Sequence, residues 1–324
     1  MPRVRCPVHA DAGAGRPGEK SASDKCDGRQ GTSPGERAGA GAEARSVRCG
    51  PWGKLRTSAT IPEMDWPRLP HPIGLLFRRR SRKAPNDLCA AFDALAGCNL
   101  EQLRAWYEPL LEGEAAGAVA EVLRLRPDQA PAALLHGGER GLPSEDRFLE
   151  SGYWRMMAGR YVLAGAWLCR GRDVLDACCG LGWGAYLVSQ YARTVTAFDS
   201  DSGSVKFAAA SWPASNIRWL CGDALDSGWL AAESFDVVLA MEAVEHFTAA
   251  DGERFVAQMA ARLRKGGVFA GTSAFPASAG EAERLAAQNP HHPHIFTEQE
   301  FLALLRRHFR RAAVAGNWMF LALR

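Results

Sequence analysis

Residues 174–184 decide the fold of this chain, and they read Val-Leu-Asp-Ala-Cys-Cys-Gly-Leu-Gly-Trp-Gly. A short apolar run ends in Asp176, three alternating glycines follow, and a helix-forming run comes directly after them. Glycine has no Cβ, so it permits a sharp turn from strand to helix and lets a ligand touch the backbone. The stretch therefore predicts a ligand-binding loop of the kind that receives nucleotides.

Short β-rich runs alternate with helical patterns after this point, which predicts a parallel sheet with right-handed crossovers. Only Gly316 and Asn317 separate the last two β-rich runs, so we expect a terminal hairpin and one antiparallel strand. The expected strands are 173–176, 194–199, 217–221, 235–240, 268–272, 312–315 and 318–323.

Helical patterns precede the sheet. A helix is expected over 148–169, and 86–134 predicts a small helical unit in which Asn99 and Gln102 form a capping pair. Such helices either cover one end of a sheet or pack against a partner. Thr297 begins a last helix with a second capping pattern.

The first part of the chain has a different composition. Residues 1–60 are rich in Gly, Ala, Ser, Arg and Pro and hold almost no large apolar side chains, so we expect a disordered tail. Residues 61–85 predict a linker whose five cations between Arg78 and Lys83 form a solvated face rather than a phosphate or lipid site. The cysteines and histidine at positions 6, 9, 26 and 49 lack a paired zinc-ligand spacing.

The composition limits the class of partner and the cellular compartment that we expect for this protein. The net charge of +3 makes nucleic acid an unexpected partner, and nine cysteines without a regular framework indicate a reduced interior. No apolar run approaches the roughly 18 residues of a membrane span, and the first residues have no hydrophobic signal core. We expect a cytoplasmic protein without a membrane span; the oligomeric state stays open.

Acidic residues close four of the expected strands. In an open α/β sheet the ligand lies beyond the carboxyl ends of the strands, where Asp176, Asp199, Asp223 and Glu242 fall. Asp199 lies 17 residues after Gly182, which is about the spacing at which a carboxylate binds the hydroxyls of a ribose. Asp223 can accept from an exocyclic amine, and the N–H of Ala224 can donate to a purine ring. Together they predict an adenosine pocket.

A nicotinamide dinucleotide is the competing ligand, because Gly180 and Gly182 also fit a loose dinucleotide fingerprint. The carboxylate of Asp176 would repel a pyrophosphate but attract an ammonium group. Adenosine with an amino-acid group and no phosphate indicates S-adenosylmethionine.

These motifs resemble those of class I S-adenosylmethionine-dependent methyltransferases of the small-molecule (type 11) kind. The resemblance covers residues 137–324 and rests on the following segments: 174–182, Asp199, 222–224, 235–239, 242–246 and 263–268. It implies a Rossmann-like, doubly wound, mostly parallel seven-stranded sheet with a C-terminal antiparallel hairpin strand, preceded by the helical unit. Cys178 stands where the family often has glycine, from which we expect a tighter turn.

The resemblance also implies roles for individual residues. Asp176 with the backbone of Gly180 and Gly182 would hold the methionine part of the cofactor, Asp199 the ribose, and Asp223 with Ala224 the adenine. Arg160 pairs with the methionine carboxylate in one interpretation and is a surface arginine in the other.

Methyl transfer to a hydroxyl benefits from a base. His246 is the first candidate, with Glu242 or Glu245 to orient it, and His292 is the second; a structural role for His246 remains the alternative. Three histidines at 291, 292 and 294 also suggest a metal, but the flanking prolines disfavour helical ligand spacing, so no metal is expected. This segment resembles a loop of sugar- and polysaccharide-linked methyltransferases.

The sequence thus predicts an enzyme that transfers a methyl group from S-adenosylmethionine to a hydroxyl oxygen of a small-molecule or glycan acceptor. Two rival interpretations remain open. One rival is a non-catalytic scaffold that binds the cofactor and acts through its N-terminal helices, and the other is an NAD-dependent dehydrogenase.

Overall fold

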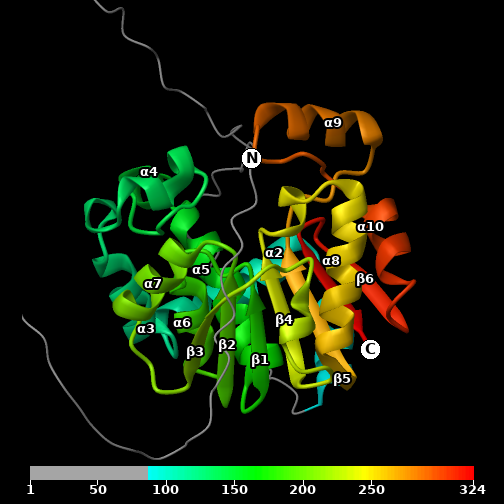
Figure 1. The fold of residues 1–324 in the computed structure, drawn as a ribbon, viewed down its shortest axis with the longest axis horizontal. Helices are drawn as coiled ribbons and strands as arrows, with labels where there is room; N and C mark the ends of the chain where they lie inside the picture. Colours follow the sequence, from blue (N-terminus) through cyan, green and yellow to red (C-terminus); the bar gives the residue numbers. More distant parts are fainter. Residues whose placement is uncertain (1–86) are drawn as a thin grey trace, which may run out of the picture. The chain divides into compact units, whose positions relative to one another are not determined.

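The computed structural model describes residues 87–324, which contain a seven-stranded sheet with helices on both faces (Figure 1). The expectations for residues 1–60 and 61–85 lie outside the described residues. The strands are β1 (Asp173–Ala177), β2 (Thr194–Asp199), β3 (Ile217–Cys221), β4 (Phe235–Met241), β5 (Leu263–Thr272), β6 (Arg311–Ala315) and β7 (Met319–Leu323).

The strand order is β3-β2-β1-β4-β5-β7-β6. The first five strands pair in parallel, while β7 is antiparallel to both β5 and β6, which confirms the predicted terminal hairpin. The order reverses between β1 and β4, so the crevice for a ligand is expected at the carboxyl ends of these two strands.

Strand β5 begins earlier than the sequence indicates. Leu263 already pairs with Phe235 of β4, and the register then shifts before Val268 pairs with Val237. The residues between Leu263 and Val268 include Gly266, whose left-handed backbone, with a φ of 79°, accompanies the change of register. An irregularity of this kind adds residues to one strand without ending the pairing, which hides the strand's start from a periodicity argument.

Alternate side chains of the strands enter two separate cores. Val174 of β1 belongs to one core and Leu175 to the other, as the two-residue period of a strand requires. The principal helices are α1 (Leu88–Ala96), α2 (Leu100–Glu112), α3 (Ala116–Arg124), α4 (Asp146–Ser151), α5 (Tyr153–Ala164), α6 (Trp183–Ser189), α7 (Ser202–Ser211), α8 (Ala249–Arg262), α9 (Ala279–Gln288) and α10 (Glu298–Leu305). Side chains of α8 and α10 fill the core of one face, and those of α1, α2, α3, α5 and α6 fill the other.

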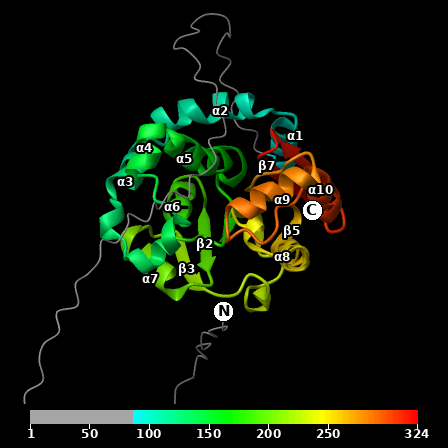
Figure 2. The same cartoon turned by 90° about the horizontal axis from the view of Figure 1, so that it is seen from above.

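The helices of residues 88–124 share the main core. Helix α1 contacts β5, β6 and β7, and α2 lies beside α5 (Figure 2). The predicted capping box of Asn99 and Gln102 is present and starts α2. Gly159 of α5 lets the two helices approach, because a Cβ there would lie 2.5 Å from the ring of Tyr107. The apolar stripes of these helices therefore cover the sheet.

The helix expected over 148–169 is divided. Gly152 takes a φ of 73° and ends α4, and α5 follows at once. A left-handed residue breaks the run of helical hydrogen bonds without interrupting the apolar periodicity, so the sequence pattern does not reveal it. A π-helical turn, η3 (Gly165–Cys169), completes the segment. Within residues 87–324 no helix has the length and apolarity to cross a membrane.

Candidate functional site

Asp176 is a buried acid near the carboxyl end of β1. Its side chain is 0% exposed, and neither carboxylate oxygen has a hydrogen-bond partner among the described residues. Burial, together with the nearby charge of Asp199, raises the pKa of Asp176 to about 8. A buried carboxyl without a partner is costly to the fold, so the position requires a reason beyond packing.

The turn after β1 uses left-handed backbone at three positions. Cys178 has a φ of 59°, a left-handed conformation that costs a residue with a Cβ some strain. Gly180, with a φ of 54°, has no heavy atom within 4 Å of the place a Cβ would take. The site fits a ligand that touches the backbone at this residue.

Gly182 serves a different purpose in the same turn. Its φ is 80°, and a Cβ would lie 2.5 Å from the Cβ of Ala208 and 2.7 Å from the ring of Trp219. It precedes α6 and lets that helix start against α7 and β3. The structure therefore gives Gly182 a packing role in addition to the expected binding role.

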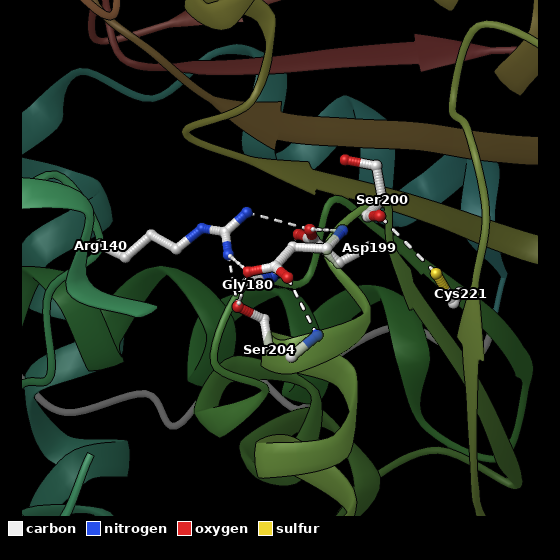
Figure 3. Close-up of polar contacts among 8 residues, drawn as sticks. Arg140, Gly180, Asp199, Ser200, Ser204 and Cys221 are labelled. Carbon is white, nitrogen blue, oxygen red and sulfur yellow. Dashed lines mark hydrogen bonds and ion pairs between the residues drawn. The ribbon is translucent and has the colours of Figure 1, made fainter. Parts of the chain in front are cut away.

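Asp199, at the end of β2, holds the turn through its carboxylate. Its Oδ2 accepts from the N–H of Gly180 at 2.9 Å, and its Oδ1 accepts from Nη2 of Arg140 at 3.0 Å. Arg140 also contacts Asp201 and Ser204 (Figure 3). Sequence reasoning did not select Arg140; the signal that could have found it is a cation in the Gly-rich segment 137–141, ahead of the glycine turn.

The loop after β3 carries both residues that were expected at the adenine. Ala224 is buried, but Asp223 is exposed and its Oδ1 accepts from the N–H of Leu225 at 2.8 Å. Trp229 covers Gly222, where a Cβ would lie 2.1 Å from the indole. Trp229 is 41% exposed and offers an aromatic surface beside this loop, which the sequence analysis did not select.

Arg160 and Glu242 pair with each other. Nη1 of Arg160 lies 2.9 Å from Oε1 of Glu242, and the arginine is buried. Glu242 follows β4 with a φ of 51°. Glu245 is buried, and burial with the charge of Glu242 raises its pKa to about 8. The hydrogen bond and ion pair of His246 are with His291 and Glu139 and not with Glu242 or Glu245, although the charge of Glu242 favours the protonated imidazole. The orientation of His246 by Glu242 or Glu245 stays a prediction.

His246 and His292 meet at Glu139. Nδ1 of His246 lies 3.1 Å from the carbonyl oxygen of His291, and its Nε2 lies 3.7 Å from Oε1 of Glu139. Nε2 of His292 lies 3.1 Å from the same oxygen. The two rings form an edge-to-face pair with centroids 5.1 Å apart. Asn289 donates from Nδ2 to Oε2 of Glu139 at 2.9 Å.

The surroundings shift the charges of this group. Burial by itself would raise the pKa of Glu139, but hydrogen bonds from His292 and Asn289 lower it to about 2. Burial lowers the pKa of His246, and the neighbouring His292 lowers it further. Sequence reasoning missed Glu139, which lies next to Arg140 and more than a hundred residues before either histidine.

The other two histidines of the segment do not bring their side chains into this group, although the backbone of His291 contacts it. The backbone N–H of His291 donates to Oδ1 of Asn289 at 3.0 Å. The ring of His294 packs edge-on against Phe296, with centroids 4.5 Å apart. The structure thus brings together one of the three clustered histidines with His246.

Comparisons with known proteins place part of the chain. A family model described as a methyltransferase domain matches residues 174–267. A protein of Mycolicibacterium smegmatis, named a probable S-adenosylmethionine-dependent methyltransferase, is 38% identical over 144 residues, which make up 44% of this chain and 53% of that protein. A relative of the same description from Mycobacterium tuberculosis (strain H37Rv) is 34% identical over 139 residues, 43% of this chain and 48% of its own.

The chain spans about half the length of the curated relatives it matches. Among solved structures, an O-methyltransferase family protein from Burkholderia thailandensis aligns with a TM-score of 0.45 and 15% identity, over 68% of this chain and 71% of that chain.

Proposed function

We propose, from the premise that residues 174–267 belong to the methyltransferase domain family, that the protein transfers a methyl group from S-adenosylmethionine to an acceptor substrate. The observation that carries this proposal is the buried, unpartnered carboxyl of Asp176, which is followed in the same strand-to-helix turn by the open backbone of Gly180. An ammonium group complements that carboxyl, whereas a pyrophosphate would be repelled by it. The cofactor supplies a methyl group activated by a sulfonium.

Different residues are proposed to bind the three parts of the cofactor. Asp176 and the backbone of Gly180 hold the methionine part, Asp199 takes the ribose, and Ala224 with Asp223 takes the adenine. A carboxylate offers about four acceptor positions. Three positions of Asp199 are used by the N–H groups of Gly180 and Asp201 and by Arg140, so two ribose hydroxyls would need Arg140 to move.

The assignment of Arg160 to the methionine carboxylate has less support than the others. Its guanidinium forms an ion pair with Glu242, and its side chain is 7% exposed. We propose instead that Arg160 positions the segment after β4, which carries Glu242 at its start and His246 four residues later.

The acceptor is proposed to be a small molecule or glycan that presents a hydroxyl. His246 is the proposed group that receives the hydroxyl's proton, and His292 is the second candidate. If Nδ1 of His246 donates to the carbonyl of His291, the lone pair of its Nε2 faces inward, toward Glu139. In this proposal Glu242 contributes through its ion pair with Arg160 and not through a contact with His246.

Calorimetric titration with S-adenosylhomocysteine and with NAD tests the cofactor. We expect the wild-type chain to bind S-adenosylhomocysteine and not NAD. Binding of NAD alone would establish the dehydrogenase instead. Formation of S-adenosylhomocysteine from S-adenosylmethionine with a pool of hydroxyl acceptors separates an enzyme from the non-catalytic scaffold.

Asp199→Ala should weaken binding of S-adenosylhomocysteine by about 1–3 kcal/mol, because ribose hydroxyls lose their acceptor. Asp226→Ala is the matched control, since Asp226 is an exposed aspartate that caps no helix end with its side chain. An Asp199→Ala variant with the dissociation constant of the control would show that the carboxylate does not contact the ribose.

A further inference from the structure

The geometry points to a divalent metal site formed by Glu139, His246 and His292, which would bind an ion of the zinc class. One ligand atom from each of these residues lies within 4.8 Å of the others. They come from three segments: the loop before α4, the turn after β4, and the loop after α9. The site therefore depends on the tertiary structure rather than on a local motif.

The distances suit coordination by nitrogen and oxygen. Bond lengths of about 2.0–2.2 Å place neighbouring ligand atoms of a tetrahedral site roughly 3.4 Å apart. Oε1 of Glu139 lies 3.1 Å from Nε2 of His292 and 3.7 Å from Nε2 of His246, which brackets this spacing. Two imidazoles and one carboxylate favour zinc and similar ions over magnesium or calcium.

Hydrogen bonds outside the three ligands hold them in a suitable orientation. The carbonyl of His291 faces Nδ1 of His246, and the amide of Asn289 holds Oε2 of Glu139. Metal-binding histidines commonly donate their second ring nitrogen to a carbonyl in this way, and such partners orient the ligand. The backbone N–H of His291 fixes the amide of Asn289 in turn.

The contacts of His292 also indicate a cation. Its Nε2 lies 3.1 Å from Oε1 of Glu139 and 3.1 Å from Nδ2 of Asn289. A protonated Nε2 would face the donor Asn289, and an unprotonated Nε2 would face the acceptor Glu139. Neither protonation state of Nε2 satisfies both contacts. An ion bound between Nε2 and Oε1 removes the repulsion between the ring lone pair and the carboxylate, and Nδ2 of Asn289 keeps its hydrogen bond to Oε2 of Glu139.

The chemical role of this site rests on the proposed function. Three protein ligands leave a fourth position for a substrate oxygen. An ion there would lower the pKa of the acceptor hydroxyl, whose proton passes to water. The oxygen then forms a bond to the methyl carbon, the carbon–sulfur bond breaks, and the sulfur keeps the electron pair. An ion bound here takes over the role proposed above for His246: the two histidines are then ligands, and the ion rather than an imidazole activates the hydroxyl.

Titration of the chelator-treated full chain with Co²⁺ and Zn²⁺ tests the site. We expect one ion per chain, visible absorption of Co²⁺ with nitrogen ligands, and binding weakened about tenfold or more in His292→Ala and in Glu139→Gln. His294→Ala is the control, because this histidine packs against Phe296 outside the group, and its ion binding should match the wild type. Thermal unfolding of each variant checks that it is folded.

The outcomes separate the two proposals. Ion binding that is absent, or equal in the wild type and Glu139→Gln, would overturn the metal site even if S-adenosylhomocysteine binds. Ion binding with the expected losses supports the site even if S-adenosylhomocysteine fails to bind, in which case only the proposed function falls.

Discussion

Asp176 shows how a single residue carries a functional cost. An acid whose pKa is raised in the folded state, to about 8 here, holds its proton in the fold and loses it on unfolding above its ordinary pKa. Its contribution to stability is fully present at pH values below about 4 and is lost as pH rises toward 8. The buried site thus disfavours the ionised carboxylate of Asp176, which is the form that an ammonium-bearing ligand would bind.

Asp176→Asn should remove this pH dependence. Between pH 5 and pH 8 we expect the melting temperature of the wild type to fall relative to that of the variant, with the variant about 1–3 kcal/mol more stable at pH 8. The same variant should bind S-adenosylhomocysteine more weakly, because the amide lacks the charge. Parallel melting curves across this pH range would contradict the shifted pKa.

At the scale of elements, one loop links both halves of the candidate site. Glu139 contacts His246 and His292, while the next residue, Arg140, contacts Asp199. The loop continues to Gly141, whose carbonyl accepts from the indole of Trp183 at the start of α6. The segment before α4 thereby fixes the side chains on the cofactor side relative to those on the proposed acceptor side.

Helix packing gives a prediction about α2 and α5. Gly159→Ala should destabilise the protein by about 1–3 kcal/mol, because the new methyl would overlap the buried ring of Tyr107. Gly117→Ala in α3 is the matched control: nothing lies within 4 Å of its Cβ position and the residue is exposed. That change should stabilise by about 0.4–1 kcal/mol. Urea unfolding measures both, and equal effects would refute the close helix contact.

For the whole molecule, the N-terminal helices and the sheet share one core. Leu103 of α2, Val174 of β1 and Leu321 of β7 belong to the same buried cluster. Elements that share a core are expected to unfold together. The scaffold alternative needed these helices for a partner, but their buried apolar residues are already used against the sheet.

Leu103→Ala should lower the stability of the entire described region by about 2–5 kcal/mol, since it leaves a cavity in that shared core. Far-ultraviolet circular dichroism and protection by S-adenosylhomocysteine should report the same single transition. An additional early transition that leaves cofactor binding intact would show that the helical unit 86–134 is a separate domain.

The sequence by itself determined the succession of strands and helices along the chain, the glycine turn and the acids at strand ends. These follow from local rules: a two-residue or 3.6-residue apolar period, capping residues, and glycine where backbone must be left-handed. The mostly parallel seven-stranded sheet and its terminal hairpin were therefore predictable.

Only the tertiary structure decided which polar side chains meet. Glu139 joins His246 and His292 across more than a hundred residues, Arg140 reaches Asp199, and Arg160 pairs with Glu242 rather than standing free. Such contacts depend on the crossing of loops over the end of the sheet, and no periodicity or spacing along the chain records that crossing. Sequence gives each residue its chemistry, and the fold supplies the neighbours against which that chemistry acts.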